Sequence, residues 1–192
     1  MAGLLVHCAE DLLAVNGDRL YQWLVDVRNA GKTAKIGVSV HTPEQAMRLL
    51  DLYEFDMIQV PLNLMDRRIM ATGLIDRLCA CEIENHVRSA VLQGLFFVSP
   101  SEIPWSLAQA RPFVEAIQQR AKETGVSVDA LALGFLRRQC QVDRVVIGVN
   151  TAEQLATNLQ AYATPIEDDQ VLDELDCNDL GIIDPSTWSI SQ

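Results

Sequence analysis

The sequence is short of basic residues, with 15 Lys and Arg against 26 Asp and Glu and a formal net charge of −11. Nucleic-acid and anionic-membrane surfaces need clustered Lys and Arg, so this balance argues against both kinds of partner. No apolar run approaches the roughly 20 residues of a membrane span. Residues 1–7 also lack the basic start and the length of a signal peptide. We therefore expect a cytoplasmic protein without a nucleic-acid or membrane partner.

The sequence lacks an even set of cysteines, because it contains five. An odd count fits reduced thiols better than a disulfide framework. The pair Cys79-x-Cys81 has no second Cys pair or nearby His at metal-ligand spacing, so no metal site is expected. The 192 residues, 49% of them hydrophobic and with no low-complexity linker, are long enough to bury a substantial core.

The stretch from Arg144 to Gln160 changes its hydrophobic period within a few residues. A β-branched run at 145–147 is typical of a buried parallel strand, and Gly148 ends it. Asn150 or Thr151 can cap the helix that follows. Backbone N–H groups at such a helix start suit a phosphate, but an ordinary strand-to-helix connection needs the same Gly and cap. Taken alone, the stretch leaves both interpretations open.

Four similar units precede this one. Strands are predicted at 4–7, 35–40, 55–60, 84–90 and 145–147. Between them lie a polar loop at 11–17, helices at 20–27, from Thr42, from Asp66, at 113–124 and at 128–140, and a long excursion at 93–105. A short helix at 168–175 and an irregular end at 184–188 are expected in the tail. Alternating strands and helices predict a parallel sheet with helices outside it.

Polar residues follow the apolar part of each predicted strand, where function gathers in sheets of this kind. They are His7, Ser39, Gln59, Arg88, and Gly148 with Asn150. Each alone has a structural explanation, such as a hydrogen-bonded core histidine or an ion pair, because a buried polar group without a partner costs about 1–3 kcal/mol. Because all of them come after the apolar part of a strand, we expect them to line a ligand-binding site at the carboxyl ends of the strands. His41 and His86 show no such placement and are expected to be surface or loop residues.

Five of these motifs, in this order, resemble the C-terminal part of aldo-keto reductases. They are Leu4-Leu-Val-His7, Lys35-Ile-Gly-Val-Ser39, Ile58-Gln59-Val-Pro-Leu-Asn63, Arg88-Ser89 through Gln93-Gly-Leu95, and Val146-Ile-Gly-Val-Asn-Thr-Ala-Glu-Gln154 through Asn158. The resemblance implies an α/β fold, a partial (β/α)8 TIM barrel of five βα units, strands four to eight. The partial barrel would cover residues 1–164, and a C-terminal tail, 165–192, would pack on it. An open doubly wound sheet is the alternative, but right-handed crossovers in sequential order favour a barrel segment.

The same resemblance implies NADP(H), possibly NAD(H), as cofactor and a small-molecule carbonyl compound as substrate. His7 would orient the substrate carbonyl, Ser39 and Gln59 would bind the nicotinamide carboxamide, and Arg88 would lie against the nicotinamide ring. Ser89 and Gln93 would lie near the pyrophosphate. The adenosine 2′-phosphate end would be surrounded by Gly148, Asn150, Thr151, Gln154 and Asn158.

Two residues depart from the family pattern. Val40 stands where many members carry an Asn that assists the Ser, so one carboxamide contact is lost. Asn150 stands where an Arg often binds the 2′-phosphate, so the resemblance does not settle the choice between NADP and NAD.

Members of the family place a catalytic Tyr, an Asp and a Lys on the second and third strands, before the histidine strand, and this sequence begins at the fourth. The Tyr supplies the proton that hydride transfer to a carbonyl requires. Tyr21, Tyr53 and Tyr162 are predicted on helices or at their ends. Activity of the chain alone is therefore not expected.

Two functions stay open at this point. The chain is either the larger part of a reductase, completed by another polypeptide or an upstream segment that supplies the N-terminal half, or a non-catalytic truncated paralogue. The paralogue would bind a nucleotide or act by homo-oligomerisation and interaction through its open sheet edges. A reading-frame fragment that does not fold alone is the remaining possibility.

Overall fold

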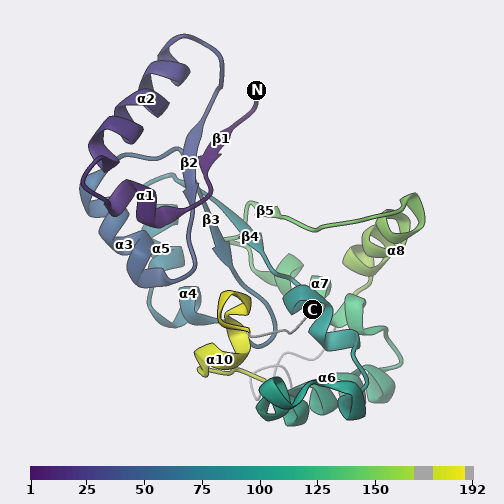
Figure 1. The fold of residues 1–192 in the computed structure, drawn as a ribbon. Helices are drawn as coiled ribbons and strands as arrows, with labels where there is room; N and C mark the ends of the chain where they lie inside the picture. Colours follow the sequence, from purple (N-terminus) through teal and green to yellow (C-terminus); the bar gives the residue numbers. More distant parts are fainter. Residues whose placement is uncertain (167–174, 189–192) are drawn as a thin grey trace. The chain divides into compact units, whose positions relative to one another are not determined.

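The computed structural model describes residues 1–166 and 175–188, which form two compact units (Figure 1). Unit 1 comprises residues 1–61, 68–88 and 141–145. Unit 2 comprises residues 62–67, 89–140 and 146–192. The short helix expected at 168–175 falls on residues 167–174, outside the described part of the chain.

Unit 1 contains a five-stranded parallel sheet in the order β1-β2-β3-β4-β5. The strands are β1 (Leu4–Val6), β2 (Ile36–Ser39), β3 (Met57–Pro61), β4 (Glu84–Arg88) and β5 (Arg144–Val145). Each strand pairs with the next one along the chain, so the sheet has no switch point of the kind that a doubly wound sheet needs. The predicted parallel α/β sheet is confirmed.

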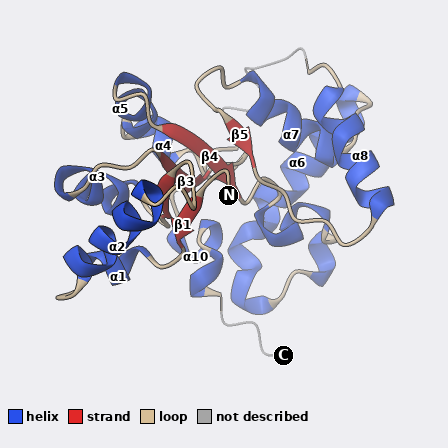
Figure 2. Ribbon diagram, turned by 90° about the horizontal axis from the view of Figure 1, so that it is seen from above, coloured by secondary structure: helices blue, strands red, loops and turns tan. Residues whose placement is uncertain are grey.

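The helices of unit 1 follow the strands and gather on one side of them (Figure 1, Figure 2). They are α1 (Ala9–Leu13), α2 (Gly17–Asn29), α3 (Pro43–Leu52), α4 (Arg68–Ala71) and α5 (Leu74–Ala80). Side chains alternate along a strand, and the fully buried positions of β2, β3 and β4 include Val38, Ile58 and Val87. These apolar side chains form the core under the helices, and the polar positions between them point to the opposite face.

Two predictions for the helices of unit 1 were wrong in detail. The polar loop expected at 11–17 begins inside α1, because Ala9 and Leu12 are buried on one side of that turn. The helix expected from Asp66 is divided into α4 and α5 by Gly73, whose φ of 72° is in the left-handed region.

The start of α3 agrees with the prediction. Thr42 Oγ1 accepts a hydrogen bond from Gln45 N at 3.2 Å, and Gln45 Oε1 accepts one from Thr42 N at 3.3 Å. This reciprocal capping box, with Pro43 at the first helical turn, satisfies backbone N–H groups that the helix leaves unpaired. The helix is thereby fixed directly after β2.

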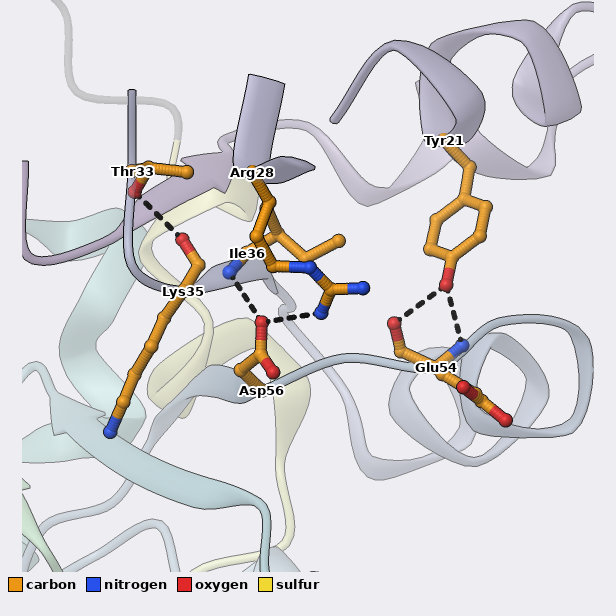
Figure 3. Close-up of polar contacts among 7 residues, drawn as sticks. All are labelled: Tyr21, Arg28, Thr33, Lys35, Ile36, Glu54 and Asp56. Carbon is orange, nitrogen blue, oxygen red and sulfur yellow. Dashed lines mark hydrogen bonds and ion pairs between the residues drawn. The ribbon is translucent and has the colours of Figure 1, made fainter. Parts of the chain in front are cut away.

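Polar contacts tie α2 to the beginnings of β2 and β3 (Figure 3). Asp56 Oδ2 accepts hydrogen bonds from Arg28 Nη1 and from the backbone N of Ile36, both at 2.8 Å. Tyr21 donates its hydroxyl proton to Glu54 O at 2.8 Å and accepts from Glu54 N at 3.2 Å. These contacts lie at the amino ends of the strands and hold the scaffold together there.

β5 is shorter than the strand predicted at 145–147, since it ends at Val145. The turn that leads into β5 is held in place by Asn85 of β4, which is fully buried. The Asn85 side chain donates to Gln141 O, and its backbone N donates to Asp143 Oδ2 at 2.9 Å. The turn before β5 is therefore clamped onto β4.

Unit 2 is largely helical. Its elements are η1 (Leu92–Phe97), η2 (Pro100–Glu102), η3 (Trp105–Ala110), α6 (Arg111–Thr124), α7 (Val128–Arg138), α8 (Ala152–Ala163), α10 (Leu180–Ile183) and η4 (Pro185–Thr187). The helices predicted at 113–124 and 128–140 are confirmed as α6 and α7, and the excursion predicted at 93–105 contains η1 and η2. The end predicted as irregular at 184–188 contains η4 instead, because the Asp184 side chain accepts from Ser186 N and caps this turn. No helix of the described residues is long and apolar enough to cross a membrane.

Candidate functional site

Ser39 and Gln59 form a hydrogen-bonded pair at the carboxyl ends of β2 and β3. The two residues are partners in the parallel register, so their side chains project from the same face of the sheet. Ser39 Oγ donates to Gln59 Oε1 at 3.1 Å, and Ser39 is buried. Within the described residues Gln59 Nε2 has no hydrogen-bond partner. The pair therefore offers a ligand one amide donor and the lone pairs of a hydroxyl oxygen, which is what a carboxamide group needs.

Arg88 is the last residue of β4 and reaches the chain that follows β2. Its Nη2 donates to Val40 O at 3.0 Å and lies 3.3 Å from His41 Nδ1. His41, predicted as a surface or loop residue, is half-buried at this contact. The guanidinium is thus held at the carboxyl end of the sheet of unit 1.

His7 directly follows β1. The register pairs Val6 with Val38, so His7 is the next position after the last pair and stands level with Ser39. The imidazole is exposed, and no described residue forms a hydrogen bond with it. His7, Ser39, Gln59 and Arg88 therefore all lie at the carboxyl ends of neighbouring strands in unit 1.

The turn that contains Ser89 and Gln93 has an unusual backbone. Ser89, Leu92 and Gln93 have φ values of 62°, 45° and 55°, and Gly94 has 85°. A left-handed conformation of a residue other than Gly costs of order 1–3 kcal/mol, and such positions cluster at functional sites. Asn63 Nδ2 supports the turn through a hydrogen bond to Ser89 O at 3.2 Å. The Gln93 side chain is exposed.

The remaining predicted residues lie at the start of α8 in unit 2. Of the two predicted capping residues, Asn150 and Thr151, Thr151 is the N-cap of α8. Its Oγ1 accepts a hydrogen bond from Gln154 N at 3.1 Å. Gln154 Oε1 accepts from Asn150 N at 2.7 Å. Gly148, which precedes α8, is exposed, and Asn158 in α8 is half-buried. The segment 145–160 contains no Lys or Arg, so it presents neutral polar groups to a ligand.

The predicted residues fall into two groups, one in each unit. Unit 1 brings Ser39 and Gln59 into direct contact and places His7 and Arg88 at the same end of the sheet. Unit 2 joins Asn150, Thr151 and Gln154 in one hydrogen-bonded cap and contains the Ser89–Gln93 turn.

The sequence interpretation missed a polar cluster on the same face of the sheet. His86 pairs in register with Gln59, so its prediction as a surface or loop residue was wrong. His86 Nε2 lies 3.3 Å from Glu84 Oε2, and Lys35 Nζ lies 2.5 Å from Glu84 Oε1. Hydrogen bonds from Lys35 and then His86 lower the pKa of Glu84. The alternation Glu84-x-His86-x-Arg88, which places the three side chains on one face, is the signal that could have revealed it.

The cysteines and acidic residues provide no metal centre among the residues the structure describes, where no group of three or more metal-ligating side chains is found. All five cysteines are free thiols. Burial raises the pKa of the Cys177 thiol, the one cysteine that is not exposed.

Comparison with known proteins gives consistent results. A model of the aldo/keto reductase family matches residues 5–176. An L-glyceraldehyde 3-phosphate reductase of Escherichia coli O157:H7 is 24% identical over 156 residues, which are 69% of this chain and 45% of that protein. The same enzyme of Escherichia coli K12 is 25% identical over the same coverage. The match therefore spans less than half the length of these relatives.

Solved structures show the same fold. An aldo-keto reductase of Bacillus halodurans in its apo form superposes with a TM-score of 0.75 at 17% identity, covering 98% of this chain and 65% of that chain. Its holo form gives a TM-score of 0.70 at the same identity. At this identity the similarity supports the fold and carries no information about a shared substrate.

Proposed function

The chain belongs to the aldo/keto reductase family, and we propose that it binds a nicotinamide cofactor as the cofactor-binding part of an NAD(P)H-dependent reductase of aldehydes or ketones. The five parallel strands would be strands four to eight of the family's (β/α)8 barrel. The observation that carries the proposal is the Ser39–Gln59 pair at the carboxyl ends of β2 and β3, with an amide donor left for a ligand.

The residues present fit the chemical parts of such a cofactor. Ser39 and Gln59 match the donor and acceptor of a carboxamide. The planar guanidinium of Arg88, fixed by Val40 O, can stack on a nicotinamide ring. The strained backbone around Ser89 and Gln93 would approach the pyrophosphate, as such strain is typical of ligand clamps.

The adenosine end fits less specifically. Gly148, Asn150, Thr151, Gln154 and Asn158 offer neutral hydrogen-bonding groups at a helix start, where backbone N–H groups favour an anion. The 145–160 segment supplies no cation for a 2′-phosphate. Both NADPH and NADH are therefore candidates, and the choice is left to measurement.

Different residues of this chain would bind the cofactor and orient the substrate during carbonyl reduction. When bound, the cofactor supplies the hydride for the carbonyl carbon. Ser39 and Gln59 hold the carboxamide so that the ring is oriented, and His7 donates a hydrogen bond that polarises and orients the substrate carbonyl. Tyr21, Tyr53 and Tyr162 lie in α2, at the end of α3 and in α8. Because no tyrosine follows a strand, the proton donor would come from strands outside this sequence.

Calorimetry with NADPH and NADH tests the cofactor part of this proposal. We expect a dissociation constant near the micromolar range for at least one of them, about −8 kcal/mol. Gln59→Leu should weaken binding, whereas Gln119→Leu, an exposed position on α6, should not. A folded chain without detectable affinity for either nucleotide would contradict the proposal.

The reductase part needs a second experiment. The chain would be mixed with a polypeptide that carries the first three βα units of a full-length relative, and NADPH or NADH oxidation would be followed with a panel of aldehydes. The panel would include L-glyceraldehyde 3-phosphate, the substrate named for the Escherichia coli relatives. A purified complex that stays inactive on the whole panel would refute this part.

A second candidate function is a non-catalytic protein that oligomerises or binds a partner. Two observations favour it: β1 and β5 are edge strands of the described sheet, and the apolar side chains of Leu155, Leu159 and Tyr162 are exposed along α8. Light scattering would then show a stable oligomer. A well-folded monomer would count against it. For either function we propose a cytoplasmic location, supported by the five free thiols.

A further inference from the structure

Two complementary polar groups occupy neighbouring positions on one face of the sheet in unit 1. β3 lies between β2 and β4, and Gln59 is in register with Ser39 on one side and His86 on the other. The Gln59 amide oxygen accepts from Ser39, which leaves the amide nitrogen for another partner. His86 uses Nε2 to contact Glu84, which leaves Nδ1 on the other side of the ring. Among the described residues neither Gln59 Nε2 nor His86 Nδ1 has a partner.

We propose that His86 is a positioning residue for Gln59. The neutral ring accepts at Nδ1 from one bridging water, which accepts in turn from Gln59 Nε2, and so fixes which way the amide points. The amide nitrogen carries two protons, so one remains for a ligand. A protonated ring has a donor at Nδ1 and cannot accept, so the amide loses its fixed orientation. Ligand binding at the Ser39–Gln59 pair thereby depends on pH.

The sign of this dependence follows from the protonation states. Binding favours the unprotonated ring, so affinity should be lower at a pH where the ring is protonated than at a pH where it is neutral. The charged groups around the ring are Glu84, Lys35, Arg88, and Arg144, which pairs with His86 in β5. Glu84 has a lowered pKa, and Lys and Arg stay protonated, so none of these four changes its charge between pH 5.5 and 8. Two further histidines lie close by, His41 against Arg88 and His7 level with Ser39, so the His86 variants and not the pH ratio alone assign the effect.

Nuclear magnetic resonance on the chain without cofactor tests the positioning step. The side-chain amide signals of Gln59, assigned by their loss in Gln59→Leu, should move between pH 5.5 and 8 with the same midpoint as the His86 ring signals. In His86→Asn, where a neutral oxygen stands near the place of Nδ1, the Gln59 signals should not move with pH. Gln59 signals that stay unchanged through the wild-type titration of His86 would overturn the proposal. This experiment needs only the wild-type chain if the His86 variant does not fold.

Calorimetry with NADH then measures the consequence for binding, and this part rests on the proposed function. The wild type should bind roughly five- to tenfold more weakly at pH 5.5 than at pH 7.5, the effect of about one neutral hydrogen bond. His86→Asn should keep its affinity at both pH values, and His86→Lys, which is always charged, should bind weakly at both. Gln119→Leu, at an exposed position on α6, is the control and should keep the wild-type pH ratio.

The two measurements separate the two proposals. An absence of NADH binding at every pH would refute the proposed function, while the Gln59 signals would still decide the role of His86. Binding with the same pH ratio in wild type and His86→Asn would overturn the role of His86 and leave the proposed function intact.

Discussion

At the scale of single residues, the Glu84 carboxylate links stability to pH. Its contacts with Lys35 and His86 lower its pKa from the ordinary value of 4.5. A lowered pKa in the folded state stabilises the protein above the unfolded value, and this contribution is lost as the pH falls through the folded value. Glu84→Gln should therefore lower the free energy of unfolding at pH 7 by about 0.5 kcal/mol, as the pair is partly exposed. Urea unfolding at pH 7 and at pH 3 measures this effect.

The control is Glu115→Gln, at an exposed position on α6. Its free energy of unfolding should differ little from that of the wild type at either pH. The difference between wild type and Glu84→Gln should shrink toward zero in acid. A difference that instead grew at pH 3 would show that the carboxylate is destabilising in the folded state.

The left-handed backbone at Gln93 makes a second prediction possible. Its φ of 55° suits Gly better than any other residue, so Gln93→Gly should be more stable than Gln93→Ala by about 1 kcal/mol. Both variants remove the side chain proposed to lie near the pyrophosphate, so both should bind the cofactor more weakly and to a similar degree. Thermal unfolding and calorimetry measure the two effects separately. Equal stability of the two variants would show that the turn is not strained.

At the scale of elements, Gly37 leaves no room for a side chain between β2 and β3. A Cβ at this position would lie 2.1 Å from Met57 O, a backbone atom that cannot move without disturbing the strand pair. Gly37→Ala should therefore destabilise the chain by about 3 kcal/mol or prevent folding. Gly148→Ala is the matched control, since nothing lies within 4 Å of its Cβ. If both variants unfolded at the same urea concentration, the close approach would have no energetic effect.

The sequence predicted the elements where a local pattern and tertiary packing agree. Thr42 and Gln45 specify the start of α3 through their own side chains, and the apolar run at Ile36–Val40 specifies a buried strand. The turn at Ala9 was missed because it has too few residues to show a helical period, and its stability comes from burial of Leu12. The 3-10 helices between 92 and 110 were missed for the same reason.

For the candidate site too, the sequence predicted only the residues that a local pattern marks. Ser39 and Gln59 were predicted because each follows an apolar run, and the register then brings them into contact. His86 was missed because it lies in the middle of β4, two residues before Arg88, and not at the end of the strand. Its place beside Gln59 and its contact with Glu84 depend on the pairing of β3 with β4, which one strand's sequence does not contain.

At the scale of the whole molecule, each of the two compact units carries its own group of candidate cofactor-binding residues. Unit 1 is a sequential parallel sheet whose carboxyl ends present Ser39, Gln59 and Arg88. Unit 2 contributes the strained turn at Ser89–Gln93 and the capped start of α8. A nucleotide bound by the residues of either unit would stabilise that unit, because a ligand that binds only the folded state raises its free energy of unfolding.

The central claim is that the Ser39–Gln59 pair binds the carboxamide of a nicotinamide cofactor, and calorimetry with two ligands tests it most directly. NADH and ADP-ribose share the adenosine and both phosphates, but ADP-ribose lacks the nicotinamide. We predict that wild type binds NADH roughly tenfold more tightly than ADP-ribose, and that Gln59→Leu loses most of this preference, because one or two hydrogen bonds to the carboxamide are lost while Ser39 and Arg88 remain. Equal affinity of the folded wild type for both ligands, or an unchanged preference in Gln59→Leu, would contradict the account.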